Sequence, residues 1–122
     1  MSASLGIIVF AHGSRDERWR LPAEALAQRV AALDPEAKVR CAYLELIEPD
    51  LAGAAQALID AGASEIRVLP FFLGVGKHLR EDLPKLLQGL RQRHPQVRFT
   101  ARPAVGEDAE LIELLARKAL DP

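Results

Sequence analysis

Two of the three histidines in this 122-residue chain follow short apolar runs at glycine-containing loops. His12 comes directly after the apolar run Leu5 to Ala11. His78 comes shortly after the run Glu65 to Leu73, from which a glycine-containing loop separates it. Glu45 directly follows a third run, Lys38 to Leu44. Imidazole binds divalent transition metals, and both imidazole and carboxylate groups can transfer protons near neutral pH. The three side chains can form a metal-handling or proton-transferring site if the fold brings them together.

Each histidine also has an ordinary structural explanation. His12 alone fits a loop histidine that is hydrogen-bonded to backbone, and His78 alone fits a helix N-terminus with no chemical role. His94 fits a cation that stabilises the C-terminus of a helix, because Pro95 follows it. A functional interpretation therefore depends on where the fold places His12 and His78.

Basic residues are concentrated around the same loops. They are Arg15, Arg18, Arg20, Lys77 and Arg80. They are either solvated surface charges or binding groups for a substrate with several carboxylates, which arginine can hold bidentately. Gly13 and Ser14 fit a tight turn with a helix cap as well as they fit contact with a ligand. Gly76 allows the loop before His78 a wider range of backbone conformations.

Short apolar runs alternate with amphipathic ones, which predicts four strand–helix units. We expect strands at 5–11, 38–44, 65–73 and 97–101, and helices at 17–33, 50–61, 79–93 and 107–120. Asp50 is the expected cap of the second helix. Pro70 should lie near the end of its strand, because proline removes a ladder donor, and Pro84 near the start of its helix.

Such a succession predicts an α/β fold in which one domain, residues 1–122, forms a flavodoxin-like three-layer sandwich. The parallel four-stranded sheet should have the order 2-1-3-4 and be flanked by helices. Ligands of such sheets bind beyond the carboxyl ends of the strands, where the strand order reverses. That point lies between the first and third strands, so His12 and His78 should be neighbours there.

Composition excludes several classes of function. Sixteen basic against seventeen acidic residues give a net charge of −1, which does not favour nucleic-acid binding. The apolar run at 5–11 is too short to span a membrane, and no targeting segment is visible. The single cysteine, Cys41, fits a packing role in a reducing compartment, so we expect a cytoplasmic protein. Neither a Walker loop nor a dinucleotide-binding fingerprint is present.

Three motifs, in register along nearly the whole chain, resemble the small CbiX and SirB type of tetrapyrrole chelatases. Residues 9–15 (VFAHGSR) resemble the family's opening strand and loop, and residues 43–49 (YLELIEP) resemble its second-strand motif. Residues 70–84 resemble the third motif, P-x-F-L followed by G-x-H-x-x-x-D-x-P.

The resemblance implies a sirohydrochlorin chelatase, a lyase that inserts Co²⁺, Fe²⁺ or Ni²⁺ for cobalamin, sirohaem or a related cofactor. The family's two metal-binding histidines map onto His12 and His78, and its acidic residue maps onto Glu45. The metal is then a substrate, and no tightly bound cofactor is expected. Short members form homodimers with the active site in the cleft between sheet ends. We expect the substrate-binding residues to be Ser14, Arg15, Gly76, Lys77 and Arg80.

Three other functions stay open on the sequence alone. A histidine phosphatase could use His12, but that chemistry usually has arginine before the histidine, and Ala11 stands there. A metal or tetrapyrrole carrier on the same fold would bind with the same residues without turnover. A domain that acts only through protein contacts would bind neither ligand.

Overall fold

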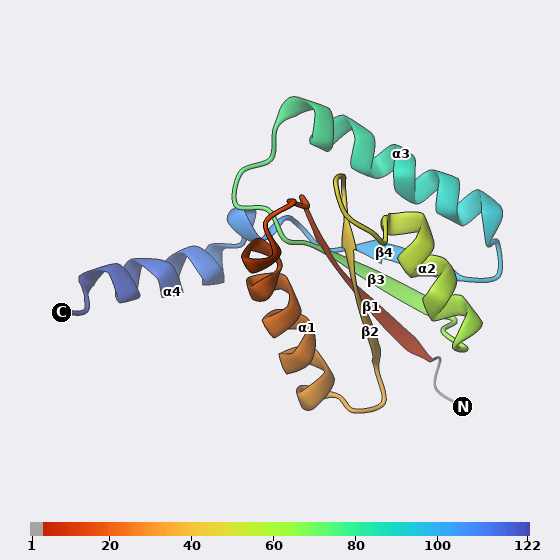
Figure 1. Cartoon of the computed structure of the whole chain (residues 1–122), viewed down its shortest axis with the longest axis horizontal. Coiled ribbons are helices and arrows are strands. Elements are labelled where there is room, and N and C mark those ends of the chain that lie inside the picture. The colour runs from red at the N-terminus through yellow and green to blue at the C-terminus, as the bar shows by residue number, and fades with distance from the viewer. Residues whose placement is uncertain (1–3) are drawn as a thin grey trace.

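Four parallel strands form one sheet in the order β2-β1-β3-β4 (Figure 1). The computed structural model describes residues 4–122. The strands are β1 (Leu5–Ala11), β2 (Lys38–Tyr43), β3 (Glu65–Pro70) and β4 (Arg98–Ala101). The helices are α1 (Leu21–Leu33), α2 (Leu51–Asp60), α3 (Lys77–Arg93) and α4 (Ala109–Leu120), with 3-10 turns η1 (Glu17–Arg20) and η2 (Val105–Glu107). The predicted fold class and strand order are confirmed.

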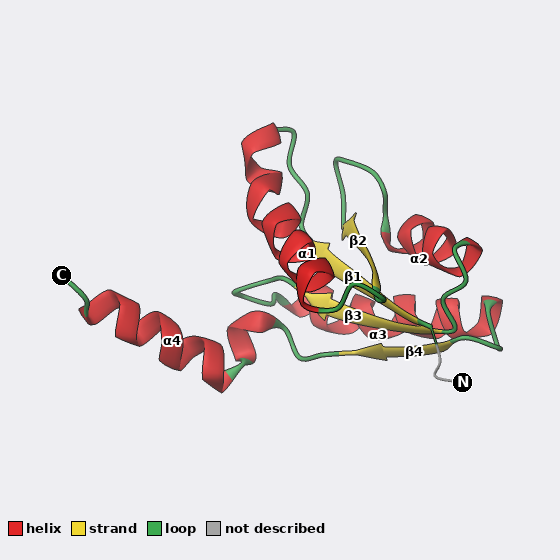
Figure 2. Ribbon diagram, turned by 90° about the horizontal axis from the view of Figure 1, so that it is seen from below, coloured by secondary structure: helices red, strands yellow, loops and turns green. Residues whose placement is uncertain are grey.

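The central strand β1 is buried on both faces of the sheet. Ile8 and Phe10 join the larger core beneath α2 and α3, whereas Val9 and Ala11 join a smaller cluster beneath α1. A strand covered on both faces carries a continuous apolar run instead of alternating residues, as β1 does. Figure 2 shows α1 on one side of the sheet, with α2 and α3 on the other.

Several predicted boundaries differ from those in the structure. β3 stops at Pro70 instead of Leu73, although Phe71 N still donates to Phe10 O at 2.7 Å. The predicted first helix is divided, because residues 17–20 form η1 and α1 starts at Leu21. α3 starts at Lys77, so Pro84 lies inside this helix and not near its start. Asp50 caps α2 as predicted, accepting from Gly53 N at 2.8 Å.

The last helix, α4, does not pack on the sheet. Both ribbon views show it leading away from the body of the molecule (Figures 1 and 2). Asp108 caps it by accepting from Glu110 N at 2.9 Å and from Leu111 N at 3.3 Å. No residue of α4 is buried. The amphipathic pattern therefore predicted this helix correctly, but not that it would stand away from the sheet.

Candidate functional site

The loops after β1 and β2 are joined to each other by backbone hydrogen bonds. Leu44 N donates to Ala11 O at 2.9 Å, and Glu45 N donates to His12 O at 3.0 Å. The parallel ladder thus continues for two residues beyond the strands. As a result, His12 and Glu45 lie side by side at the carboxyl edge of the sheet, where the sequence placed them.

Gly13 makes this close approach possible. Its φ of +99° is in the region that favours glycine, and the Glu45 carbonyl occupies the space that a Cβ atom would need. Leu46, on the facing loop, also has a positive φ, of 72°. The two loops are therefore held by backbone contact and leave the side chains of His12 and Glu45 exposed.

The His12 imidazole is supported on one side by an aromatic ring. Its centroid lies 4.9 Å from that of Phe72, at an interplanar angle of 88°. Phe72 is 3% exposed and packs edge-to-face on Phe10 at 5.7 Å. Edge-to-face aromatic contacts of this kind are favourable and directional. The ring of His12 is thus held against the core while the residue stays accessible to a ligand.

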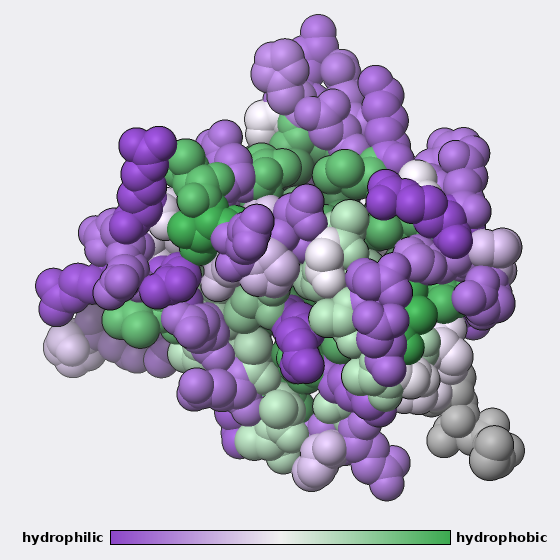
Figure 3. Space-filling view, turned by 45° about the vertical axis from the view of Figure 1, so that its right-hand side comes forward, coloured by the Kyte–Doolittle hydropathy of each residue, from purple (hydrophilic) through white to green (hydrophobic). Residues whose placement is uncertain are grey.

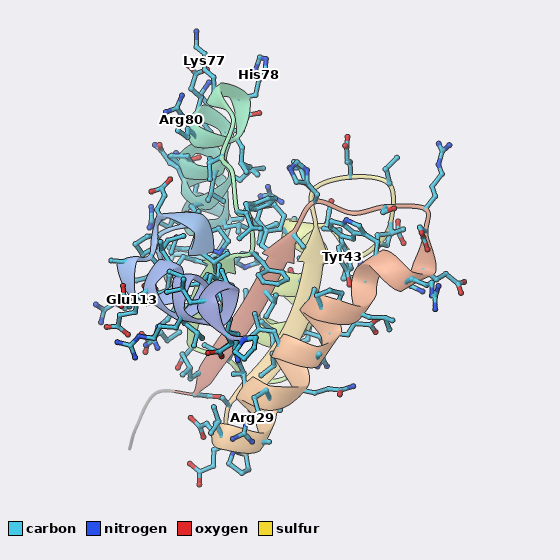
Figure 4. All side chains as sticks on the ribbon, turned by 90° about the vertical axis from the view of Figure 1, so that its left-hand side faces the viewer. Arg29, Tyr43, Lys77, His78, Arg80 and Glu113 are labelled. Atoms are coloured by element: carbon cyan, nitrogen blue, oxygen red, sulfur yellow. The ribbon has the colours of Figure 1, made fainter. Side chains whose placement is uncertain are left out.

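His78 lies at the exposed tip of α3, beside two other basic residues. Figure 4 shows Lys77, His78 and Arg80 at this tip, with the side chains of Lys77 and His78 pointing away from the sheet. Gly76 precedes the helix and offers no side-chain cap, and the first turn contains no acid. Cations at a helix N-terminus oppose the helix dipole, whereas uncapped N–H groups there bind anions. The tip of α3 is therefore suited to an anionic ligand.

The structure does not assemble a complete metal cage from these residues. Within residues 4–122 no group of three histidine, cysteine, aspartate or glutamate side chains is placed to hold a metal ion. His12 and Glu45 come together, and His78 stands on a different element at the same edge. The expectation that His12 and His78 share one metal stays a prediction.

The other predicted binding residues lie on two loops, the one after β1 and the one before α3. Ser14 Oγ accepts from Asp16 N at 3.0 Å, so it has the turn-forming role that its type allowed. Asp16, and not Ser14, caps η1. Arg15 is exposed on the same loop, and Gly76 has no atom within 4 Å of an added Cβ.

Two residues that the sequence analysis did not assign to the site lie at the same edge. Phe72, which lies within the third motif at residues 70–84, supports His12. Arg102 follows β4, where its backbone N donates to Val68 O at 2.8 Å. A cavity of about 410 Å³ between α3 and the ends of β3 and β4 is lined by both Arg102 and Arg80. Applying the carboxyl-end rule to all four strands would have found Arg102.

Cys41 and Tyr43 pack together on the α1 side of the sheet. Burial raises the pKa of the Cys41 thiol, an effect that the Tyr43 side chain partly opposes. Burial, and then the neighbouring Cys41, raise the pKa of Tyr43 to about 12. Both groups therefore stay protonated near neutral pH, which agrees with the predicted packing role of Cys41.

The comparisons with known proteins agree with the motifs. The family model CbiX matches residues 6–121. A sirohydrochlorin ferrochelatase from Priestia megaterium is 28% identical over 92% of this chain, which spans only 42% of that protein. A sirohydrochlorin cobaltochelatase from Sulfolobus acidocaldarius is 25% identical over 94% of this chain and 89% of that protein.

The solved structures show the same fold. A protein from Marinobacter aquaeolei VT8, described as a CbiX protein of cobalamin (vitamin B12) biosynthesis, superimposes with a TM-score of 0.79. It is 32% identical, over 95% of this chain and 91% of the other. In the part of the chain that the structure describes, no helix is both long and apolar enough to cross a membrane.

Proposed function

We propose, because the chain belongs to the CbiX family, that it is a sirohydrochlorin chelatase that inserts a divalent metal ion, Co²⁺ or Fe²⁺, into the tetrapyrrole. The observation that supports this most directly is the exposed His12 imidazole, which Phe72 supports at the carboxyl edge of the sheet. Both a relative named as a ferrochelatase and one named as a cobaltochelatase match this chain. Experiment therefore decides between Co²⁺ and Fe²⁺, and whether Ni²⁺ is also inserted.

The residues at this edge divide the chemistry between them. Insertion replaces two N–H protons of the macrocycle by the metal, so the site must offer both a metal ligand and a proton acceptor. His12 and His78 are the proposed ligands, since imidazole binds Fe²⁺, Co²⁺ and Ni²⁺ alike. Glu45, or one of the histidines, is the proposed acceptor, and Glu45 is fixed beside His12 by the hydrogen bond from its backbone N.

Basic groups around the site are the proposed partners of the substrate's carboxylates. Lys77 and Arg80 lie at the tip of α3 next to the backbone of Gly76, and the first turn of this helix contains no acid. Arg15 and Ser14 lie on the loop that carries His12. An anion bound near α3 would also remove the unfavourable interaction between these cations and the helix dipole.

A transient metal site fits this role better than a permanent one. A chelatase must release its metal to the macrocycle, so it needs fewer protein ligands than a structural zinc site has. The metal is thus a substrate, and we propose no resident cofactor. We further propose a homodimer, because one chain of this size cannot cover both faces of the macrocycle. We also propose that the protein acts in the cytoplasm.

The decisive experiment is an absorbance time course. The protein is mixed anaerobically with sirohydrochlorin and, in separate reactions, Co²⁺, Fe²⁺ or Ni²⁺, each against a control without protein. Metallation that is faster than the control establishes the chelatase, and the relative rates rank the metals. A spectrum that shows binding without acceleration identifies a carrier instead, and an unperturbed spectrum contradicts both functions.

Histidine variants test the assigned roles. His12→Ala and His78→Ala should each lower kcat/KM at least tenfold, because each removes a proposed metal ligand. The matched control is His94→Gln at the other end of α3, where the ring packs against Phe99 at 6.2 Å. The control should insert metal at the wild-type rate. Wild-type activity in His78→Ala would show that the ligand role of His78 is wrong.

A further inference from the structure

A cavity next to the His12 site combines an apolar lining with several arginines. It has a volume of about 410 Å³ and lies between α3 and the carboxyl ends of β3 and β4. Leu79, Leu83 and Leu87 line it from α3. By contrast, the side of the molecule that includes α2 shows mainly hydrophilic side chains, with scattered apolar areas between them (Figure 3). The apolar lining is therefore a local feature of this cavity and not of the surface in general.

One side of α3 forms a long wall of the cavity. The residues that line it at helical spacing are Arg80, Leu83, Leu87 and Arg91. At the far end, Nε and Nη2 of Arg91 donate to Phe99 O at 3.3 and 2.9 Å, so this guanidinium is used to hold α3 against β4. Arg80 lies at the opposite end, in the first turn of α3 (Figure 4). The arginine nearer the carboxyl edge of the sheet is thus the one available to a ligand.

Arg102 lines the same cavity from the sheet. It directly follows β4, and the hydrogen bond from its backbone N to Val68 O at 2.8 Å fixes its position at the carboxyl edge. Within residues 4–122, neither Arg102 nor Arg80 forms an ion pair with an acidic side chain. Glu107 is the one acidic residue among those that line the cavity. The lining therefore carries an excess of positive charge, which favours an anionic ligand.

Phe72 connects the cavity to the His12 site. Its ring lines the cavity and also meets the His12 imidazole edge-to-face, with the two ring centroids 4.9 Å apart. A metal ion bound to His12 would therefore be separated from the cavity by little more than one aromatic side chain. A flat macrocycle centred on that metal extends well beyond it in every direction, so its side arms would reach across Phe72 to the cavity.

We propose that this cavity receives one carboxylate-bearing side arm of the tetrapyrrole, and that Arg102 binds its carboxylate together with Arg80. The apolar lining suits the methylene carbons of such an arm. The two arginines suit its carboxylate, because a guanidinium group can bind both carboxylate oxygens at once. Binding of one arm in the cavity fixes the orientation of the macrocycle relative to His12.

This inference rests on the proposed function, to which it adds a binding residue, Arg102, and a position for one arm of the substrate. The two can nevertheless fail separately. A wild-type protein that does not bind sirohydrochlorin contradicts the proposed function, and the inference with it. Binding of sirohydrochlorin that does not depend on Arg102 contradicts the inference alone.

Titration with metal-free sirohydrochlorin measures binding without any insertion. Arg102→Gln should raise the Kd about tenfold, because it removes a charged partner of the carboxylate. Arg102→Lys keeps the charge but not the bidentate geometry, so it should recover only part of the affinity. The matched control is Arg98→Gln, an exposed arginine at the other end of β4, which should bind as the wild type does. An unchanged Kd in Arg102→Gln, or an equal loss in Arg98→Gln, would overturn the proposal.

Steady-state kinetics separate a binding role from a role in the insertion step. Arg102→Gln should raise KM for sirohydrochlorin and leave kcat nearly unchanged, because the arm is bound both before and during insertion. A lower kcat at unchanged KM would mean that Arg102 acts on the reaction and not on the arm, and it would contradict the proposal.

Filling the cavity tests whether the arm enters it. Leu83 is half-buried in the lining, so Leu83→Phe takes up part of the space and should raise the Kd for sirohydrochlorin. The matched control is Leu86→Phe on the same helix, where the leucine is 40% exposed and does not line the cavity. This control should bind as the wild type does, and far-UV spectra check that both variants are folded. Wild-type affinity in folded Leu83→Phe would show that the arm lies elsewhere.

Discussion

Phe72 determines how the His12 imidazole is presented at the site. The two rings meet edge-to-face at 4.9 Å, and Phe72 is anchored by Phe10 in the core. Phe72→Leu keeps an apolar core residue but removes the aromatic support, which is worth about 1 kcal/mol. We expect kcat for metal insertion to fall about fivefold with little change in KM for sirohydrochlorin. Steady-state kinetics and the far-UV spectrum test this, and a change in KM alone would contradict a positioning role.

Tyr43 is the only tyrosine in the chain, so its ionisation can be followed directly. Its pKa is raised from 10.0 to about 12 in the folded protein. Folding therefore favours the protonated phenol. The resulting stability is fully present below pH 10 and is lost as the pH rises toward about 12. Phenolate absorbance should show a midpoint near 12 in native protein and near 10 in urea. A native midpoint near 10 would show that the ring is not buried.

At the residue scale, the sequence predicted locations better than contacts. Apolar runs identify strands, and the carboxyl-end rule then places His12 and Glu45 at one edge, as the structure confirms. The rule gives no distances, so it could not show how far His78 stands from His12 on the tip of α3. The support of His12 by Phe72 was also hidden, because an apolar residue at a strand end is ordinarily assigned to the core.

At the scale of elements, the β1 and β2 loops depend on one glycine. Gly13→Ala places a methyl group against the Glu45 carbonyl and requires φ near +99°. Non-glycine residues in such regions cost about 1–3 kcal/mol, so we expect the free energy of unfolding to fall by about 2 kcal/mol or more. Gly74→Ala is the matched control, because an added Cβ there meets nothing within 4 Å. Chemical denaturation measures both, and equal stabilities would contradict the close approach.

The elements that were predicted least well are those whose ends depend on tertiary contacts. β3 was expected to reach Leu73, because its apolar run continues past Pro70. Proline lacks the donor that a longer ladder requires, so the chain leaves the sheet there. For α4, periodicity predicted the helix, but its departure from the sheet follows from the anchored turn η2, which no local pattern reveals.

For the whole molecule, the proposed homodimer makes thermal stability depend on protein concentration. A protein whose chains are stabilised by a second copy should unfold at a temperature that rises with protein concentration, because dilution favours separated chains. We expect the Tm of the chain to rise by several degrees between low and high micromolar concentration, and thermal melts at both concentrations measure this. A Tm that does not vary with concentration would mean that each chain is stable alone, and it would contradict the proposed homodimer.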